Sequence, residues 1–218
     1  MARLKLGVLI SGRGSNLQAL IDAARDPAFP AAPALVLANK PDAFGLQRAA
    51  EAGIPTAVIR HKDFADKPAF EQAMTAELQR HGVELVCLAG FMRVLSPWFV
   101  EAWADRLINI HPSLLPAFPG LDTHARALAA GVRLHGCTVH YVRAGVDDGP
   151  ILVQAAVPVL AGDSEADLAA RVLAQEHRCY PLAVRLIAEG RARVAGQTVS
   201  LEAAAPGLAG AALVNPPG

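Results

Sequence analysis

Runs of apolar residues and segments of helical periodicity alternate along the first ninety residues. Leu4–Ile10 is almost continuously apolar, which is typical of a strand buried on both faces of a sheet. A glycine-containing turn follows, and apolar residues then recur at helical spacing from Leu17 to Ala24. The cycle continues with predicted strands at 34–38, 56–59 and 85–89 and predicted helices at 44–52 and 68–81. This alternation predicts an α/β fold, in which an open, twisted and mostly parallel sheet carries helices on both faces.

The pattern is less regular in the second half of the chain. Pro97 predicts the start of a short helix, and Leu107–Ile110 is a further buried strand that ends in a proline-rich loop at 111–120. Beyond this loop we expect a helix at 123–130, strands at 136–143 and 151–159, a long helix at 164–189 and a hairpin at 193–201. Since no linker interrupts this order, we expect a single domain over residues 1–202 and a loosely ordered tail over 203–218.

The composition narrows the class of protein. Of the 218 residues, 53% are hydrophobic, and 20 Lys and Arg balance 20 Asp and Glu, which excludes a disordered chain and a strongly basic nucleic-acid binder. The three cysteines are far apart, which fits neither a disulfide framework nor a zinc site and indicates reduced thiols in a cytoplasmic protein. The N-terminal apolar run is too short for a signal segment or a membrane span. We therefore expect neither a nucleic-acid partner nor a membrane partner.

The glycine turn at 12–16 is the first candidate for chemistry. It joins a strand to a helix, and the free N–H groups of a helix N-terminus bind phosphate readily. The alternative is an ordinary turn in which Ser15 or Asn16 caps the helix. A dinucleotide fingerprint fits poorly, because Leu17 replaces its third glycine and the second strand ends at Asn39-Lys40 without an acidic residue. The turn therefore favours a phosphomonoester over NAD or ATP.

Asn109 and His111 form the second candidate. They stand two residues apart at the end of a predicted strand, so their side chains point to the same face at the edge where α/β sheets bind ligands. An amide donor can stabilise an oxyanion, and an imidazole beside it can transfer a proton. The alternative is that both side chains only satisfy the backbone of the following loop.

The third candidate is the sequence Asp147-Asp148-Gly149-Pro150. Two acidic residues before Gly-Pro are typical of a turn, and a turn alone is one interpretation. If the fold returns a carboxylate to the imidazole, it favours the charged form of the histidine. Asn, His and Asp without a cluster of metal ligands suit acyl-type transfer through a tetrahedral intermediate.

Five groups of residues occur in an order that resembles a known family. They are Gly14-Ser15-Asn16, Phe91-Met92-Arg93, the run 109–116, Asp147 to Pro150, and Gln175-Glu176-His177 followed by Tyr180-Pro181. Over about residues 4–195 the chain resembles the phosphoribosylglycinamide formyltransferases, folate-dependent enzymes of purine synthesis. The run Asn-x-His-Pro-Ser-x-Leu-Pro with a later Asp-x-Gly-Pro is specific to folate-dependent formyl transfer.

The resemblance implies a fold, a reaction and a co-substrate. The fold would be the Rossmann-like formyltransferase fold, with a nucleotide-phosphate half at about 1–100 and a folate and catalytic half at about 101–202. The enzyme would transfer the formyl group of 10-formyltetrahydrofolate to the amine of glycinamide ribonucleotide in de novo purine biosynthesis. The amine would attack directly through a tetrahedral intermediate, with no metal. We expect a monomer or a weak homodimer.

The resemblance also implies roles for individual residues. Asn109 would polarise the formyl oxygen, His111 would donate the proton, and Asp147 would favour the charged imidazole. The nucleotide phosphate would bind Gly14, Ser15 and Asn16, and its ribose hydroxyls would bind Glu176. The folate would contact Lys67, Met92, Arg93, Val94, Leu95, Asn109, Arg143, Ala144, Gly145, Val146 and Asp147. Lys67 stands where the family often has an arginine, so it would meet the glutamate tail of folate without a bidentate fork.

Three other functions stay open at this point. Methionyl-tRNA formyltransferase resembles the chain around Asn109, His111 and Asp147, but would need a further C-terminal domain and a basic face. Formyltetrahydrofolate hydrolase would need an additional N-terminal domain. A catalytically idle phosphate-binding module would bind ligand at 14–16 without turnover.

The remaining aromatic and histidine residues are assigned to packing or to the surface. The core is expected to contain Trp98, Phe99 and Trp103. Surface or turn positions are expected for His61, His81 and His135. His140, in a strand near the predicted site, is left open between packing and a ligand contact.

Overall fold

The computed structural model describes residues 2–202, and the predicted tail at 203–218 lies outside the described residues. The strands are β1 (Leu4–Ile10), β2 (Ala31–Ala38), β3 (Thr56–Val58), β4 (Leu85–Leu88), β5 (Leu107–His111), β6 (Leu134–Tyr141), β7 (Ile151–Pro158), β8 (Ala192–Ala195) and β9 (Thr198–Leu201). The α-helices are α1 (Ser15–Ala24), α2 (Gly45–Glu51), α3 (Lys67–Arg80), α4 (Pro97–Ala102), α5 (Thr123–Ala129) and α6 (Glu165–Ala188).

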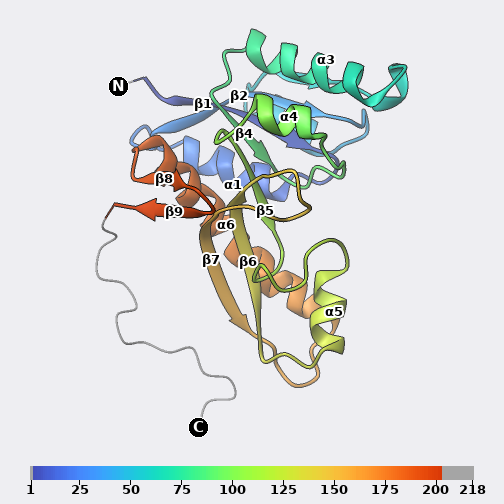
Figure 1. The fold of residues 1–218 in the computed structure, drawn as a ribbon, viewed down its shortest axis with the longest axis vertical. Helices are drawn as coiled ribbons and strands as arrows, with labels where there is room; N and C mark the ends of the chain where they lie inside the picture. The colour runs from blue at the N-terminus through green and yellow to red at the C-terminus, as the bar shows by residue number, and fades with distance from the viewer. Residues whose placement is uncertain (1, 203–218) are drawn as a thin grey trace.

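Seven strands form one sheet in the order β3-β2-β1-β4-β5-β6-β7 (Figure 1). The first five of these strands in that order pair in parallel, whereas β6 pairs antiparallel with both β5 and β7. Strands β8 and β9 form a separate antiparallel hairpin after α6. The predicted α/β fold with a mostly parallel sheet is therefore confirmed.

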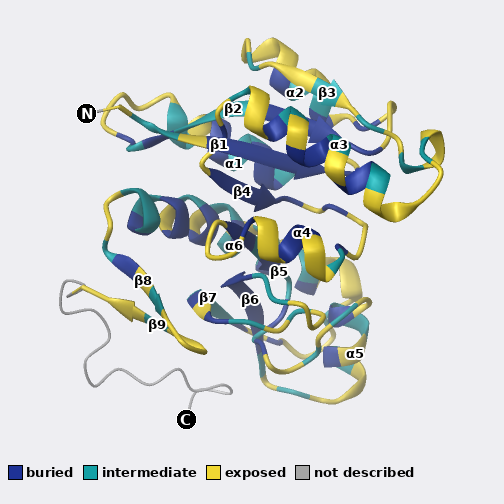
Figure 2. Ribbon diagram, turned by 45° about the horizontal axis from the view of Figure 1, so that its top comes forward, coloured by how far each residue is buried: buried dark blue, intermediate teal, exposed yellow. Residues whose placement is uncertain are grey.

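Alternate side chains of the strands belong to two apolar clusters, one on each face of the sheet. In β1, Leu6, Val8 and Ile10 pack with α1 and α6, while Leu9 packs with α3 and α4 on the other face. Figure 2 shows the buried strands between the two layers of helices, whose outer faces are exposed. Because the central strands contact helices on both sides, their sequences are apolar almost throughout.

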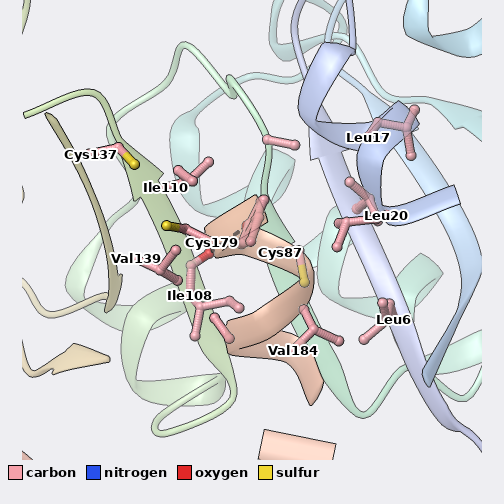
Figure 3. Close-up of a cluster of buried hydrophobic side chains, with 14 of the residues drawn as sticks. Leu6, Leu17, Leu20, Cys87, Ile108, Ile110, Cys137, Val139, Cys179 and Val184 are labelled. Atoms are coloured by element: carbon pink, nitrogen blue, oxygen red, sulfur yellow. Dashed lines mark hydrogen bonds between the residues drawn. The ribbon is translucent and has the colours of Figure 1, made fainter. Parts of the chain in front are cut away.

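Helix α6 packs against the apolar cluster that contains Leu6, Val8 and Ile10. Its N-terminus carries a capping box in which Ser164 and Asp167 satisfy each other's backbone groups. Its buried side includes Cys179, Ala183 and Val184, which lie among residues of β1, β4 and β5 (Figure 3). On the same helix, the hydroxyl of Tyr180 donates to the carbonyl oxygen of Leu88 at 2.9 Å, which ties α6 to the carboxyl end of β4.

The three cysteines are free thiols, as predicted, and all three are buried. Burial raises the pKa of the Cys87 thiol to about 12, so this side chain packs as a neutral apolar group. No helix among residues 2–202 is long and apolar enough to cross a membrane.

Two sequence predictions about packing are wrong. Trp98 is 45% exposed, whereas Phe99 and Trp103 are core residues as predicted, because the short helix α4 turns Trp98 outward. His135 is 1% exposed and lies in β6, which begins at Leu134 and not at 136 as predicted. The sequence pattern also missed a 3₁₀ turn at His61–Asp63 and the first three residues of β2.

Candidate active site

The carboxyl ends of β1, β4 and β5 lie side by side where the strand order reverses. From β1 the chain passes through α1 to β2 on one side, while β4 lies on the other side of β1. Ligands of open α/β sheets bind in the crevice outside the strand ends at such a point. The turn at 12–16 follows β1, the segment 89–96 follows β4, and the pair Asn109 and His111 lies in the last three residues of β5.

The first turn is shaped by close backbone packing at Gly14. Gly14 is the N-cap of α1 and has a φ of 68°, a conformation that favours glycine. A Cβ on Gly14 would lie only 2.7 Å from the Cα of Gly45, at the start of α2. The two segments are also joined by the N–H of Gly45, which donates to the carbonyl oxygen of Gly12 at 3.0 Å. The fold itself therefore requires glycine here, independently of any ligand.

Asn16 and Glu176 meet although they are 160 residues apart. The Asn16 amide donates to a carboxylate oxygen of Glu176 at 2.6 Å, which links the N-terminus of α1 to α6. Both side chains are buried, and burial raises the pKa of Glu176 against the opposing effect of this hydrogen bond. The amide oxygen of Asn16 has no hydrogen-bond partner among the described residues. A polar atom of this kind is suited to a ligand hydroxyl.

A cavity of about 330 Å³ opens beside Ser15 and is lined also by Gln18, Arg48 and His177. Arg48 is held there, because its guanidinium donates to the carbonyl oxygen of Arg13 at 3.0 Å. The cavity thus combines the first turn of α1 and a fixed cation, both of which attract an anion, with the carboxylate of Asp22, which opposes one.

Asn109 and His140 lie opposite each other on β5 and β6, and their contact fixes the orientation of both. The Nδ1 of His140 is 3.0 Å from the carbonyl oxygen of Tyr141 and therefore carries the proton. Its Nε2 then accepts from the Asn109 amide at 3.3 Å. Burial lowers the pKa of His140, which keeps the ring neutral. One N–H of Asn109 stays available for another acceptor.

His111 lies between two acceptors that come from distant loops. Its Nδ1 is 3.4 Å from a carboxylate oxygen of Asp147, and its Nε2 is 3.1 Å from the carbonyl oxygen of Phe118. The ring is 5% exposed. An imidazole that faces an acceptor at each nitrogen is held in one orientation.

Asp147 is fixed by a strained turn. Its φ of 49° is unusual for a residue other than glycine and costs about 1–3 kcal/mol. Its second carboxylate oxygen accepts from the N–H of Gly120 at 2.7 Å. At Gly149, a Cβ would lie 2.1 Å from the carbonyl oxygen of Tyr141, so the turn closes tightly against β6. The third candidate is therefore more than a surface turn, since it returns Asp147 to His111.

The segment 92–95 is held at both ends by hydrogen bonds to buried polar residues, Ser11 and Glu71. At one end, the N–H of Met92 donates to the hydroxyl of Ser11 at 2.8 Å, and this hydroxyl donates to Asn39. At the other end, Ser96 donates its N–H to Glu71 at 2.7 Å and also its hydroxyl. Between these anchors Met92 and Val94 are 63% and 67% exposed, while Leu95 is buried. Exposed apolar side chains held on a rigid segment are suited to an aromatic ligand.

Lys67 lies beside the same anchor, with its ammonium 4.0 Å from a carboxylate oxygen of the buried Glu71. Arg143, on the other side of the site, points to Asp105 at 2.7 Å. Its side chain is thus engaged in an ion pair, while Ala144, Gly145 and Val146 are exposed around the turn.

The comparisons with known proteins agree with this geometry. A family model described as "Formyl transferase" matches residues 4–184. The chain belongs to the formyl transferase family. It is 49% identical over 191 residues to the phosphoribosylglycinamide formyltransferase of Escherichia coli. The aligned residues make up 88% of this chain and 90% of that protein.

Two further relatives of this formyl transferase place the match in context. The chain is 52% identical over 200 residues to the trifunctional purine biosynthetic protein adenosine-3 of Drosophila melanogaster, and the match spans 15% of the length of that protein. The crystal structure of glycinamide ribonucleotide transformylase 1 from Symbiobacterium toebii matches with a TM-score of 0.89 and 50% identity, over 91% of this chain and 94% of that one.

Sequence analysis missed several residues that position the site of this formyl transferase. Ser11 and Thr138 are ordinary polar residues in sequence. Tertiary contacts show that Ser11 accepts from Met92 and that the Thr138 hydroxyl donates to the carbonyl oxygen of Ser113, in the loop after His111. Glu71 carried a signal, because it shares the buried helix side of Met74 and Leu78, where a carboxylate is unexpected without a partner. Among residues 2–202 no group of three or more His, Cys, Asp or Glu side chains is arranged to hold a metal ion.

His135 should make the stability of this formyl transferase depend on pH. Burial is the main cause that lowers its pKa to about 4, against about 6.5 in an unfolded chain. The stabilisation is complete above pH 6.5 and is lost as the pH falls towards 4, since only the unfolded chain then binds the proton. The free energy of unfolding, measured with urea at several pH values, should fall more steeply with decreasing pH in the parent than in His135→Gln. The difference in slope should be on the order of 1 kcal/mol per pH unit. Equal slopes would contradict this assignment.

Proposed function

We propose that the chain transfers the formyl group of 10-formyltetrahydrofolate to the amine of glycinamide ribonucleotide in de novo purine biosynthesis. The observation that carries this proposal is the approach of Asp147, from the turn after β6, to His111 of β5, the strand that also carries Asn109, in a chain that belongs to the formyl transferase family. The relatives named phosphoribosylglycinamide formyltransferase and glycinamide ribonucleotide transformylase support the choice of substrate. We further propose a single domain over 1–202 and a cytoplasmic enzyme that acts as a monomer or weak homodimer.

The nucleotide would bind in the half formed by about residues 1–100, together with α6. The backbone N–H groups at Gly14, Ser15 and Asn16 would hold the phosphate, which the helix N-terminus favours. Glu176 and the unpartnered oxygen of Asn16 would hold the ribose hydroxyls, since both are buried acceptors at the same point. This arrangement would bring the glycinamide amine towards β5.

The folate would lie against the half formed by about residues 101–202, between it and the segment 92–95 of the other half. Met92, Arg93, Val94 and Leu95 on one side, and Arg143 to Asp147 on the other, would contact its ring system. Lys67 would meet the glutamate tail from the N-terminus of α3. Because the Lys67 ammonium is shared with Glu71, its attraction for a carboxylate is moderated by a charge of the same sign as the ligand.

In the reaction the amine nitrogen bonds to the formyl carbon, and the bond from that carbon to the folate nitrogen breaks. The available N–H of Asn109 would donate to the formyl oxygen as negative charge develops in the tetrahedral intermediate. The Nδ1–H of His111 lies on the side of Asp147, and would protonate the departing folate nitrogen. The amine loses one proton and the folate nitrogen gains one, so no net proton is consumed. Asp147 would orient the imidazole through its contact with Nδ1.

The proposal is tested by incubating the protein with glycinamide ribonucleotide and 10-formyltetrahydrofolate. Mass spectrometry of the nucleotide and absorbance of the folate should report equal amounts of formylated nucleotide and deformylated folate. His111→Asn should lower kcat by about 10²–10³ and change the nucleotide Kd by less than about threefold, because the proton is transferred only in the reaction.

The matched control is His81→Asn at the far end of α3, which should keep parental turnover. Deformylated folate without nucleotide would favour a hydrolase, and ligand binding without turnover would favour an idle phosphate-binding module. Either result would contradict the proposed transfer.

Ser15→Ala should weaken nucleotide binding roughly threefold to thirtyfold, since a hydrogen bond to a charged group is lost while the backbone donors remain. It is a cleaner probe than Gly14→Val, whose side chain would strike the backbone of Gly45. Calorimetry should report folate binding within about twofold of the parent. Ser200→Ala, on the exposed β9, is the matched control. Unchanged nucleotide binding in Ser15→Ala would mean that its hydroxyl does not contact the phosphate.

A further inference from the structure

The loop between β5 and α5, residues 112–122, supplies backbone groups to both members of the proposed catalytic pair. The carbonyl oxygen of Phe118 accepts from His111 at 3.1 Å, and the N–H of Gly120 donates to Asp147 at 2.7 Å. These two groups are only two residues apart in sequence. The position of one short segment therefore sets the orientation of both side chains.

This segment has an unfavourable backbone. Phe118 and Asp122 have φ values of 54° and 55°, and neither residue is glycine. Left-handed conformations of such residues persist only when surrounding contacts hold them. Part of this support is apolar, because the Phe118 ring packs edge-on against the buried ring of His135, with 5.9 Å between the centroids.

Arg126 supplies the polar part of the support. It lies on α5, and its guanidinium donates to the carbonyl oxygen of Pro119 at 2.5 Å and to that of Leu121 at 3.2 Å. The same guanidinium lies over the Phe118 ring, 5.7 Å from its centroid. The two accepting carbonyls immediately flank Gly120, and the ring belongs to the residue that accepts from His111.

Helix α5 is a firm base for this contact. Its residue Ala127 is fully buried, and the N–H of Arg126 itself donates to the carbonyl oxygen of Asp122 at 3.0 Å. The side chain of Arg126 is exposed, and among residues 2–202 its guanidinium donates to backbone carbonyls and to no carboxylate, so its contacts serve the loop and not an ion pair. An arginine on a helix of this kind is otherwise expected to be a solvated surface residue.

We propose that Arg126 is a positioning residue for formyl transfer, which holds the loop so that Phe118 and Gly120 orient His111 and Asp147. It contacts neither member of the pair directly and acts through the backbone of residues 118–121. The inference rests on the proposed roles of His111 and Asp147. It predicts that turnover depends on a side chain whose hydrogen bonds go to the backbone of this loop.

The experiment compares Arg126→Met, Arg126→Lys and a matched control. Methionine keeps an unbranched stem but removes every donor, whereas lysine keeps a charge and one group that can reach a carbonyl. The control is Arg106→Met, since Arg106 also donates to a backbone carbonyl, that of Ala102, and lies over an aromatic ring, that of Trp103, but at the opposite end of β5. Each variant is measured for kcat, for KM of both substrates, for thermal unfolding and for hydrogen exchange of the Gly120 amide.

In Arg126→Met, kcat should fall about tenfold or more while both KM values change less than about threefold, because the loop orients the reacting groups without binding substrate. The Gly120 amide should exchange faster, Tm should match that of Arg106→Met, and Arg126→Lys should recover part of the loss in kcat. Arg106→Met should keep parental kcat and Gly120 exchange.

Parental kcat in Arg126→Met would overturn the inference, as would a fall in kcat with Gly120 protected as in the parent. Failure of the proposed function is distinguished by the parent, which would then form no formylated nucleotide, while the exchange of Gly120 in Arg126→Met still reports on the loop. If Arg126→Met does not fold, the same comparisons are made with Arg126→Lys, which should show an intermediate loss in kcat and protection.

Discussion

The geometry of the site depends on how the Asp147 carboxylate is held. A residue other than glycine adopts a left-handed backbone there, and one of its carboxylate oxygens is fixed by the N–H of Gly120 while the other faces His111. This contact joins the loop after β5 to the turn between β6 and β7. Without this contact, the antiparallel strands β6 and β7 would lie near the site, but the Asp147 carboxylate would not be held in it. Strain of this kind is common where a side chain must be aimed at a reacting group.

Helix α6 provides the complementary constraint. It crosses the first apolar face of the sheet and brings Glu176 to Asn16 at the first turn, while Tyr180 on the same helix binds the carboxyl end of β4. One element thus connects the proposed nucleotide site to the strands that carry the proposed folate site. Since these contacts are buried, the distance between the two sites is set by core packing and not by a mobile hinge.

Much of this arrangement could be predicted from sequence because it follows from local pattern. The strands are visible as apolar runs. The glycine turn follows one such run, and Asn109 and His111 lie at the end of another, and strand ends meet at one edge of a parallel sheet. The contacts that orient the site were not predictable in the same way. Arg126 looks like any exposed helical residue, and the approach of Gly120 to Asp147 depends on two loops 27 residues apart. His135 was misassigned because its burial results from the packing of Phe118 and His124 over β6.

The central claim is that His111 and Asp147 act as one unit, and a double-mutant cycle on kcat tests it most directly. The cycle compares the parent with His111→Asn, Asp147→Asn and the double variant, after each has been shown to be folded. Residues that act as a unit give strongly non-additive effects, so the double variant should be no more than about threefold slower than the slower single variant. If the two losses multiply instead, the residues act independently, and the contact between them does not carry the reaction.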